Sequence, residues 1–352
     1  MTSRERISTI LSGGIPDRVG MDESPWGETY ALWATQGMPE GTDIIAYFDM
    51  DLAKVGGPDT SFQFETVEIA EDDTYRTFRD SRGVTCKVHK FESGHTPHWL
   101  DHLIHDQESW KANVARLAPK RDRLAADVVE QYAGARKSDR FVAVCMADPY
   151  ENAWPTFGQV GIFTLMMDDP DFVGHVMMTY AELMVGLFEI MEELGCDYDG
   201  IFMFADLGYR NSTLFNPELY RKLVQPAHAL VCDWQRAHGR PVICHSCGKI
   251  DVLIPNFIEA GMAAIQPLEA KCGQDVRELK KLYGKDITFF GNMDIRKLSG
   301  TREDVYEEVM GKLPIAMEGG GYIFHSDHSV PPTVSWDNYC YAVELVKKHG
   351  VY

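Results

Sequence analysis

The feature that most limits how this chain can fold is a regular alternation of apolar segments and helical segments after residue 140. Six strands are predicted, at 141–148, 199–206, 241–248, 263–269, 287–294 and 322–329. A helix is predicted before each, at 107–136, 171–195, 217–238, 250–260, 274–283 and 302–317, and a final helix at 336–349. Strands that are almost wholly apolar and alternate with helices are typical of a parallel sheet that is covered on both faces.

The first part of the chain adds two strands and an excursion. A helix is predicted over 2–12, and strands over 17–26 and 51–56, which brings the units to eight and favours an α/β (β/α)8 barrel of the TIM type over an open sheet. Residues 57–105 alternate apolar and polar side chains, with turn signals at Asp72, Asp73 and 81–83. This pattern predicts an antiparallel hairpin or meander inserted near the N-terminus of one barrel domain, 1–352.

Charge and composition exclude several kinds of partner. The chain has 352 residues and a net charge of −19, which argues against a nucleic-acid partner or an anionic membrane surface. No apolar run has the length of a membrane span, and the N-terminus lacks the apolar core of a signal peptide. Eight scattered cysteines suit a reducing compartment, so a cytoplasmic protein is expected. No glycine-rich phosphate motif opens a helix, which leaves a nucleotide site without support.

A histidine and a cysteine on the strand 241–248 form the clearest candidate metal site. Strand side chains alternate in direction, so His245 and Cys247 share one face and Cys244 takes the other. They stand at the carboxyl end of the strand, where barrel enzymes place their active sites. A catalytic zinc ion needs three protein ligands, and the last strand offers His325, Asp327 and His328. The alternative is that His245 and Cys247 only pack against their neighbours and bind no metal.

Three acids are candidates for catalysis. Asp206 ends an apolar strand, where a carboxylate is costly unless it is paired or functional. It is a candidate to orient a ligand histidine, to act as a general acid, or to pair with Arg210. Glu23 and Glu151 are weaker candidates, and the alternative for both is ordinary hydrogen bonding at a strand end.

Aromatic side chains are expected in the loops on the same face of the barrel. They are predicted to wall a pocket for a flat apolar substrate, although packing in the core or at the rim is the alternative. The candidates for substrate binding are Trp26, Tyr150, Trp154 and Tyr209, together with His325, and Trp33 and Phe157 belong to the same aromatic set.

Five stretches of the sequence together resemble a known superfamily. They are G-I-P-D-R-V, D-L-G-Y-R-N-S-T-L-F-N-P-E-L-Y, C-H-S-C-G-K-I, F-F-G-N-M-D and G-G-Y-I-F-H-S-D-H-S-V-P-P. The chain resembles the uroporphyrinogen decarboxylase superfamily over nearly its whole length. More narrowly, it is similar to the branch of zinc- and corrinoid-dependent methyltransferases of anaerobes. The resemblance implies a (β/α)8 barrel, in agreement with the alternation described above.

The early segment departs from the true decarboxylases. Those enzymes carry an arginine-rich R-Q-A-G-R-Y signature that grips the carboxylates of the porphyrinogen, whereas this chain has D-E-S-P-W-G-E-T-Y. Acids at that place would repel a substrate that bears many carboxylates. Decarboxylation of a porphyrinogen is therefore not expected.

The resemblance also implies a zinc site with one altered ligand. The methyltransferases bind zinc through H-x-C and a later cysteine before the last proline-containing turn. His245 and Cys247 match the first two positions, and His328 stands where the later cysteine is expected. With one thiolate fewer, the zinc is more electrophilic and better suited to polarise an ether oxygen than to hold a nucleophilic thiolate.

The expected reaction is transfer of a methyl group from an O-methyl donor, such as a methoxylated aromatic, to the cob(I)amide of a corrinoid protein. The corrinoid is assigned to a separate partner because the D-x-H-x-x-G motif of a cobamide-binding domain is absent. Three alternatives stay open: a methylcobamide:thiol methyltransferase, a metal-independent decarboxylase or lyase that uses Asp206, His245 and His328, and a non-catalytic corrinoid-binding barrel. A homodimer is also left open.

Overall fold

Eight parallel strands curl into a barrel in the computed structural model, which describes residues 1–90 and 97–352. Strands β7 to β12 lie side by side in chain order, β2 pairs with β7 at one edge of the sheet, and β1 pairs with β12 at the other. The Asp51 N–H at the start of β2 donates to the Met21 carbonyl of β1 at 2.7 Å, which joins the two outer strands. The predicted (β/α)8 class is confirmed. The strands are β1 (Gly20–Met21), β2 (Leu52–Gly56), β7 (Phe141–Ala147), β8 (Gly200–Phe204), β9 (Val242–Ser246), β10 (Ala264–Pro267), β11 (Thr288–Phe290) and β12 (Tyr322–Phe324).

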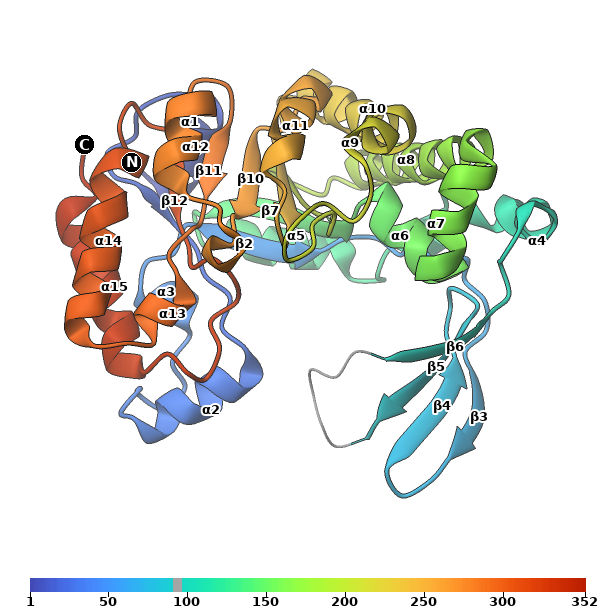
Figure 1. Ribbon diagram of the computed structural model, residues 1–352, viewed down its shortest axis with the longest axis horizontal. Helices are drawn as coiled ribbons and strands as arrows, with labels where there is room; N and C mark the ends of the chain where they lie inside the picture. The colour runs from blue at the N-terminus through green and yellow to red at the C-terminus, as the bar shows by residue number, and fades with distance from the viewer. Residues whose placement is uncertain (91–96) are drawn as a thin grey trace.

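Helices surround this barrel, with α8 and α10 on one flank and α14 and α15 on the other (Figure 1). Their apolar faces pack against the outward side chains of the strands in one large core. The α-helices are α1 (Ser3–Leu11), α2 (Gly27–Thr35), α3 (Ile44–Tyr47), α4 (Gln107–Asn113), α5 (Val128–Arg136), α6 (Pro149–Phe157), α7 (Gln159–Asp168), α8 (Pro170–Glu193), α9 (Pro217–Leu219), α10 (Gln225–Ala237), α11 (Ile254–Ala260), α12 (Val276–Tyr283), α13 (Ile295–Leu298), α14 (Arg302–Ala316) and α15 (Trp336–His349).

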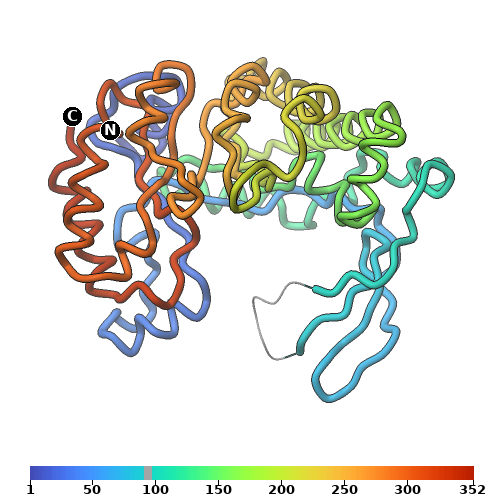
Figure 2. The backbone as a smooth tube through the Cα atoms, in the orientation of Figure 1, coloured from blue at the N-terminus to red at the C-terminus, as the bar shows by residue number. Residues whose placement is uncertain are grey.

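Helix α1 closes the amino-terminal end of the barrel. Its Ile7 and Ile10 are fully buried and pack with inward side chains from seven of the strands, among them Phe141, Phe202 and Phe290. The two chain ends lie at the same end of the molecule (Figure 2), where Arg18 forms a β-bridge with Val351. The opposite, carboxyl-terminal end is left for the loops that follow the strands.

Several predicted helices are wrong in extent. The single helix expected over 107–136 is broken into α4, two 3-10 turns (Val114–Leu117 and Arg121–Arg123) and α5, because Pro119 interrupts it. The helix over 217–238 contains a π turn, Tyr220–Val224, before α10. Helices α6 and α7 were not predicted at all, although Asp148 caps α6 and Pro149 begins it.

Helix α8 is long and apolar enough, by length and composition, to cross a membrane. Many of its apolar side chains are instead buried inside the protein, where the helix packs against α6 and α10. A core helix passes the same test of length and composition, so α8 belongs to the barrel's outer layer.

The predicted N-terminal β excursion is confirmed as a four-stranded antiparallel sheet. It consists of β3 (Val67–Glu71), β4 (Tyr75–Arg79), β5 (Val84–His89) and β6 (His98–His102), and it extends away from the barrel on the same side as α2 (Figure 1). Trp99 of β6 packs edge-on against Trp154 of α6, with ring centroids 5.0 Å apart. Residues 91–96 of the predicted insertion lie outside the described residues, and the division of the chain into one domain plus an insertion stays a prediction.

Candidate functional site

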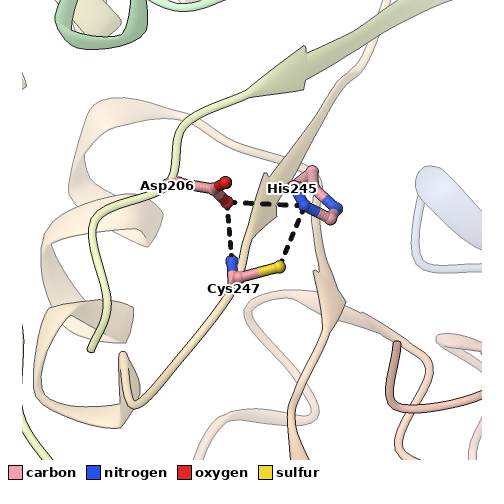
Figure 3. Close-up of side chains that lie close together, drawn as sticks. All are labelled: Asp206, His245 and Cys247. Carbon is pink, nitrogen blue, oxygen red and sulfur yellow. Dashed lines mark hydrogen bonds and ion pairs between the residues drawn. The ribbon is translucent and has the colours of Figure 1, made fainter. Parts of the chain in front are cut away.

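Three of the predicted site residues meet where β8 and β9 end. The His245 Nε2 lies 3.4 Å from the Cys247 Sγ and 3.4 Å from the Asp206 Oδ1. The backbone N–H of Cys247 donates to the same Asp206 oxygen at 2.9 Å. Figure 3 shows the three side chains pointing toward one another from two neighbouring strands. Their possible ligand atoms lie within 4.8 Å of one another, so they are a candidate metal group.

The local backbone holds these side chains in place. The alternation along β9 turns His245 and Cys247 to one face, and Cys244 is fully buried on the other. Gly248 follows at a φ of 79°, and a Cβ there would overlap the backbone of Gly208 in the loop after β8. The two loops can approach this closely only because both positions are glycine. This contact brings Asp206 next to the end of β9.

A second candidate metal group shares Cys247 with the first. It consists of Cys247, Glu269 and His328, again with possible ligand atoms within 4.8 Å of one another. Glu269 is buried, and it accepts a hydrogen bond from the Cys272 thiol at 3.0 Å. Among the described residues no such group contains both His245 and His328. Cys247 is therefore the common point, with one histidine on each side.

These donors fit a zinc ion by their chemistry. Zinc binds cysteine sulfur, histidine nitrogen and carboxylate oxygen, which are the atoms gathered around Cys247. Burial and the charges of Asp206 and Glu269 raise the pKa of the Cys247 thiol. A bound cation reverses that effect, because it favours the thiolate.

Asp206 and Glu151 differ in protonation. Burial and the charges of Asp148 and Asp206 raise the pKa of Glu151 to about 8. Burial acts in the same upward direction on Asp206, but the hydrogen bond to His245 and its charge outweigh it and hold the pKa of Asp206 below its ordinary value. At neutral pH Glu151 therefore keeps its proton while Asp206 is ionised. Such a pair of carboxyl groups with divergent pKa values is typical of an acid and its charged neighbour in an active site.

Asp148 is held behind Glu151 by a buried chain of contacts. Its Oδ1 accepts from the Glu151 N–H at 2.5 Å, and its Oδ2 lies 2.5 Å from the His228 Nε2. The Nδ1 of His228 lies 2.9 Å from the Tyr220 hydroxyl. Asp148, Tyr220 and His228 are completely buried, so they fix the start of α6 rather than face the mouth of the barrel.

Glu23 and His325 form a separate polar cluster inside the barrel. The His325 Nε2 lies 3.2 Å from the Glu23 Oε1, and both side chains are buried. Burial lowers the pKa of His325 to about 4 and raises the pKa of Glu23 to about 7. The Ser326 hydroxyl donates to Glu23 at 2.9 Å. His325 is thus neutral at pH 7 and lies beneath the surface, so it does not line an open pocket.

The aromatic candidates separate into two groups. Trp26 is 45% exposed and stands edge-on to His328, with ring centroids 5.9 Å apart, and Tyr209 is 66% exposed. Trp154 is half-buried on α6, not in a loop as expected. Tyr150 is also on α6, and it is fully buried against Phe215. The core likewise contains Trp33 and Phe157.

Two residues of the site were given no role from the sequence. Gln266 on β10 lies in register with His245 and contacts it, and Glu269 follows the same strand. Both stand in the apolar stretch A-A-I-Q-P-L-E. A buried polar side chain in such a strand is costly unless it is hydrogen-bonded or functional. The presence of Gln266 and Glu269 in this apolar stretch could therefore have marked both as candidate site residues.

The family is decided by a comparison of the sequence with family models. The model of uroporphyrinogen decarboxylase (URO-D) matches residues 90–349, which is most of the chain. The chain belongs to this family. The superfamily resemblance found in the five sequence stretches is thereby confirmed. No curated protein matches the sequence of this URO-D family member.

One solved structure agrees with the fold of this URO-D family member over nearly its whole length. A methyltransferase from Methanosarcina mazei aligns over 99% of both chains with a TM-score of 0.69 and 14% identity. A sugar phosphate isomerase/epimerase from Parabacteroides distasonis aligns over 95% of this chain and 98% of its own, with a TM-score of 0.40 and 8% identity. At 14% identity the similarity to the methyltransferase supports the fold alone, and the alignment with a TM-score of 0.40 adds no argument.

Proposed function

We propose that this protein is a corrinoid-dependent methyltransferase that moves a methyl group from an O-methyl donor, such as a methoxylated aromatic, to the cob(I)amide of a separate corrinoid protein. The observation that carries the proposal is the meeting of Cys247 with two histidines and two carboxylates at the carboxyl-terminal face of the barrel. The similarity to the Methanosarcina mazei methyltransferase supports the same choice within the URO-D family.

His245, Cys247 and His328 are the proposed zinc ligands. Held by these three side chains, a zinc ion would supply Lewis acidity toward the ether oxygen of the donor. The backbone N–H of Cys247 donates to Asp206, which holds the loop after β9 in place. Trp26 beside His328 offers an exposed aromatic face to a flat donor.

Glu151 is the proposed proton donor. The methyl–oxygen bond breaks, its electron pair stays on the oxygen, and that oxygen takes the Glu151 proton. The methyl group forms its new bond with the electron pair of the partner's cob(I)amide. Glu151 suits this role because it is protonated at neutral pH and neighbours Asp206 at the end of β8.

The proposal is tested by metal analysis followed by an assay of methyl transfer. The purified protein is expected to hold close to one equivalent of zinc. With a cob(I)amide protein and a panel of methoxylated aromatics, the absorbance of methylcobamide should grow only when a suitable donor is present. Zinc in trace amounts only would refute the zinc mechanism. Success with methylcobamide and a thiol, but with none of the ethers, would reverse the direction of transfer.

His328 is predicted to be the third zinc ligand. His328→Ala should lose most of its zinc during dialysis against a weak chelator, because two ligands remain where three are needed. Glu269→Gln is the matched comparison, since Glu269 lies in the same group. Zinc content, measured by mass spectrometry, decides whether His328 or Glu269 is the third ligand. Full zinc in His328→Ala together with loss in Glu269→Gln would move the third ligand to β10.

A further inference from the structure

A single buried amide joins the two polar clusters of the barrel interior. Gln266 on β10 is 4% exposed. Its Oε1 is in hydrogen-bond contact with the His245 Nδ1, and its Nε2 lies 3.3 Å from the His325 Nε2. His245 belongs to the candidate metal group, and His325 lies beside Glu23. The amide therefore stands between a proposed zinc ligand and the inner acid cluster.

The direction of each hydrogen bond follows from one backbone carbonyl. The His325 Nδ1 lies 2.6 Å from the Ser326 carbonyl oxygen, which can only accept, so Nδ1 carries the hydrogen. The Nε2 of a neutral His325 then has a lone pair and needs a donor, and the Glu23 Oε1 at 3.2 Å can donate to it only when Glu23 is protonated. The amide nitrogen of Gln266 is such a donor, and this places the amide oxygen toward His245.

The hydrogen on Nδ1 of His245 follows from its contact with the same amide. An amide oxygen only accepts, so the hydrogen in its contact with His245 must be on Nδ1. The Nε2, which lies 3.4 Å from the Cys247 Sγ and 3.4 Å from the Asp206 Oδ1, is then the ring nitrogen left to bind a cation. A histidine binds a metal through a nitrogen without hydrogen, and its other nitrogen usually donates to a fixed acceptor.

We infer that Gln266 is a positioning residue that holds His245 in its Nδ1–H tautomer and aims the Nε2 lone pair at the metal position, while its amide nitrogen holds His325 in the matching tautomer. The inference rests on the proposed function for the zinc. The tautomers themselves follow from hydrogen bonds within the chain alone. Gln266 reaches both rings because β10 lies next to β9, with Gln266 in register with His245.

Two substitutions separate the acceptor from the donor. Gln266→Leu removes both, whereas Gln266→Glu keeps an acceptor toward His245 and loses the donor toward His325. The matched control is Gln225→Leu, which removes a buried glutamine amide that contacts Asn256 between α10 and α11. Thermal unfolding of all three shows whether each variant is folded before its other properties are compared.

Zinc affinity is the first measurement, made by competition with a chromophoric chelator. Gln266→Leu should bind zinc about 10–100-fold more weakly than the wild type, the usual effect of removing the partner of a ligand histidine. Gln266→Glu and Gln225→Leu should remain close to the wild type. Equal affinity in a folded Gln266→Leu protein would overturn the inference.

The second measurement does not need zinc. Long-range ¹⁵N–¹H spectra of the metal-free protein distinguish the two histidine tautomers by the nitrogen shifts. The wild type should show His245 with hydrogen on Nδ1, and Gln266→Leu should show a mixture of tautomers. If the wild-type protein binds no zinc, the proposed function fails, and these spectra still decide the role of Gln266. His245 with hydrogen on Nε2 in the wild type would refute it.

Discussion

Glu151→Gln is expected to slow methyl transfer from an ether donor by about 10²–10⁴-fold, the usual contribution of a positioned general acid. The amide keeps the shape of the side chain but has no acidic proton for the leaving oxygen. Burial beside Asp148 and Asp206 raises the pKa of Glu151 to about 8, so the acid form dominates below this pH. The wild-type rate should therefore fall as the pH rises through about 8, and this fall should be absent in Glu151→Gln. Single-turnover rates between pH 6 and 10 measure both effects.

Two comparisons make this prediction specific. Glu130→Gln removes an exposed carboxylate on α5 and should leave the rate and its pH profile unchanged. Glu23→Gln tests the other carboxyl group with a raised pKa, which is about 7. If the fall at high pH persists in Glu151→Gln and disappears in Glu23→Gln, the proton donor is Glu23.

The barrel was predictable because its signal repeats along the chain. Each strand after residue 140 is apolar on both faces and is followed by a polar residue, and this pattern is specific to a covered parallel sheet. The meeting of Asp206 with His245 and Cys247 follows from the same logic, since β8 and β9 are neighbours and both end at one face. Alternation along β9 settles which side chains share that face.

Contacts between distant loops were not predictable in the same way. His328 was expected beside His245, but the structure groups it with Cys247 and Glu269. The position of His328 depends on the path of the segment after β12, which carries no periodic signal. Sequence order places a residue on a strand end, but the bend of the following loop decides which neighbour it reaches.

The aromatic residues show a second limit. Tyr150 and Trp154, in the stretch P-Y-E-N-A-W-P, were expected in a loop on the active face of the barrel. Pro149 lies in the first turn of α6, where the missing N–H costs nothing, and the Asp148 side chain caps the helix. The helix turns Tyr150 into the core and leaves Trp154 half-buried against Trp99.

Asp51→Asn is expected to lower the free energy of unfolding by about 3–5 kcal/mol, the usual cost of removing one partner from a buried ion pair. Asp51 is completely buried and accepts from Arg6 at 2.7 Å, from Arg18 at 2.8 Å and from the Met21 N–H at 2.8 Å. Asparagine can still accept from Met21, but Arg18 loses its counter-charge and Arg6 keeps only its pair with the exposed Asp17. The change would therefore weaken the point at which β1 and β2 close the barrel. Urea-induced unfolding, followed by far-ultraviolet circular dichroism, measures the loss as a lower midpoint at constant slope.

The matched control for this prediction is Asp49→Asn, two residues earlier. Asp49 pairs with Lys347 at 2.7 Å, but its side chain is 73% exposed, so the pair is screened by water. An exposed pair of this kind contributes about 0–1 kcal/mol, and its loss should barely move the midpoint. Equal, small effects of the two substitutions would show that Asp51 is not needed to close the barrel. The junction of β1 and β2 would then depend on the backbone hydrogen bond from Asp51 to Met21 and on the packing of α1 beneath it.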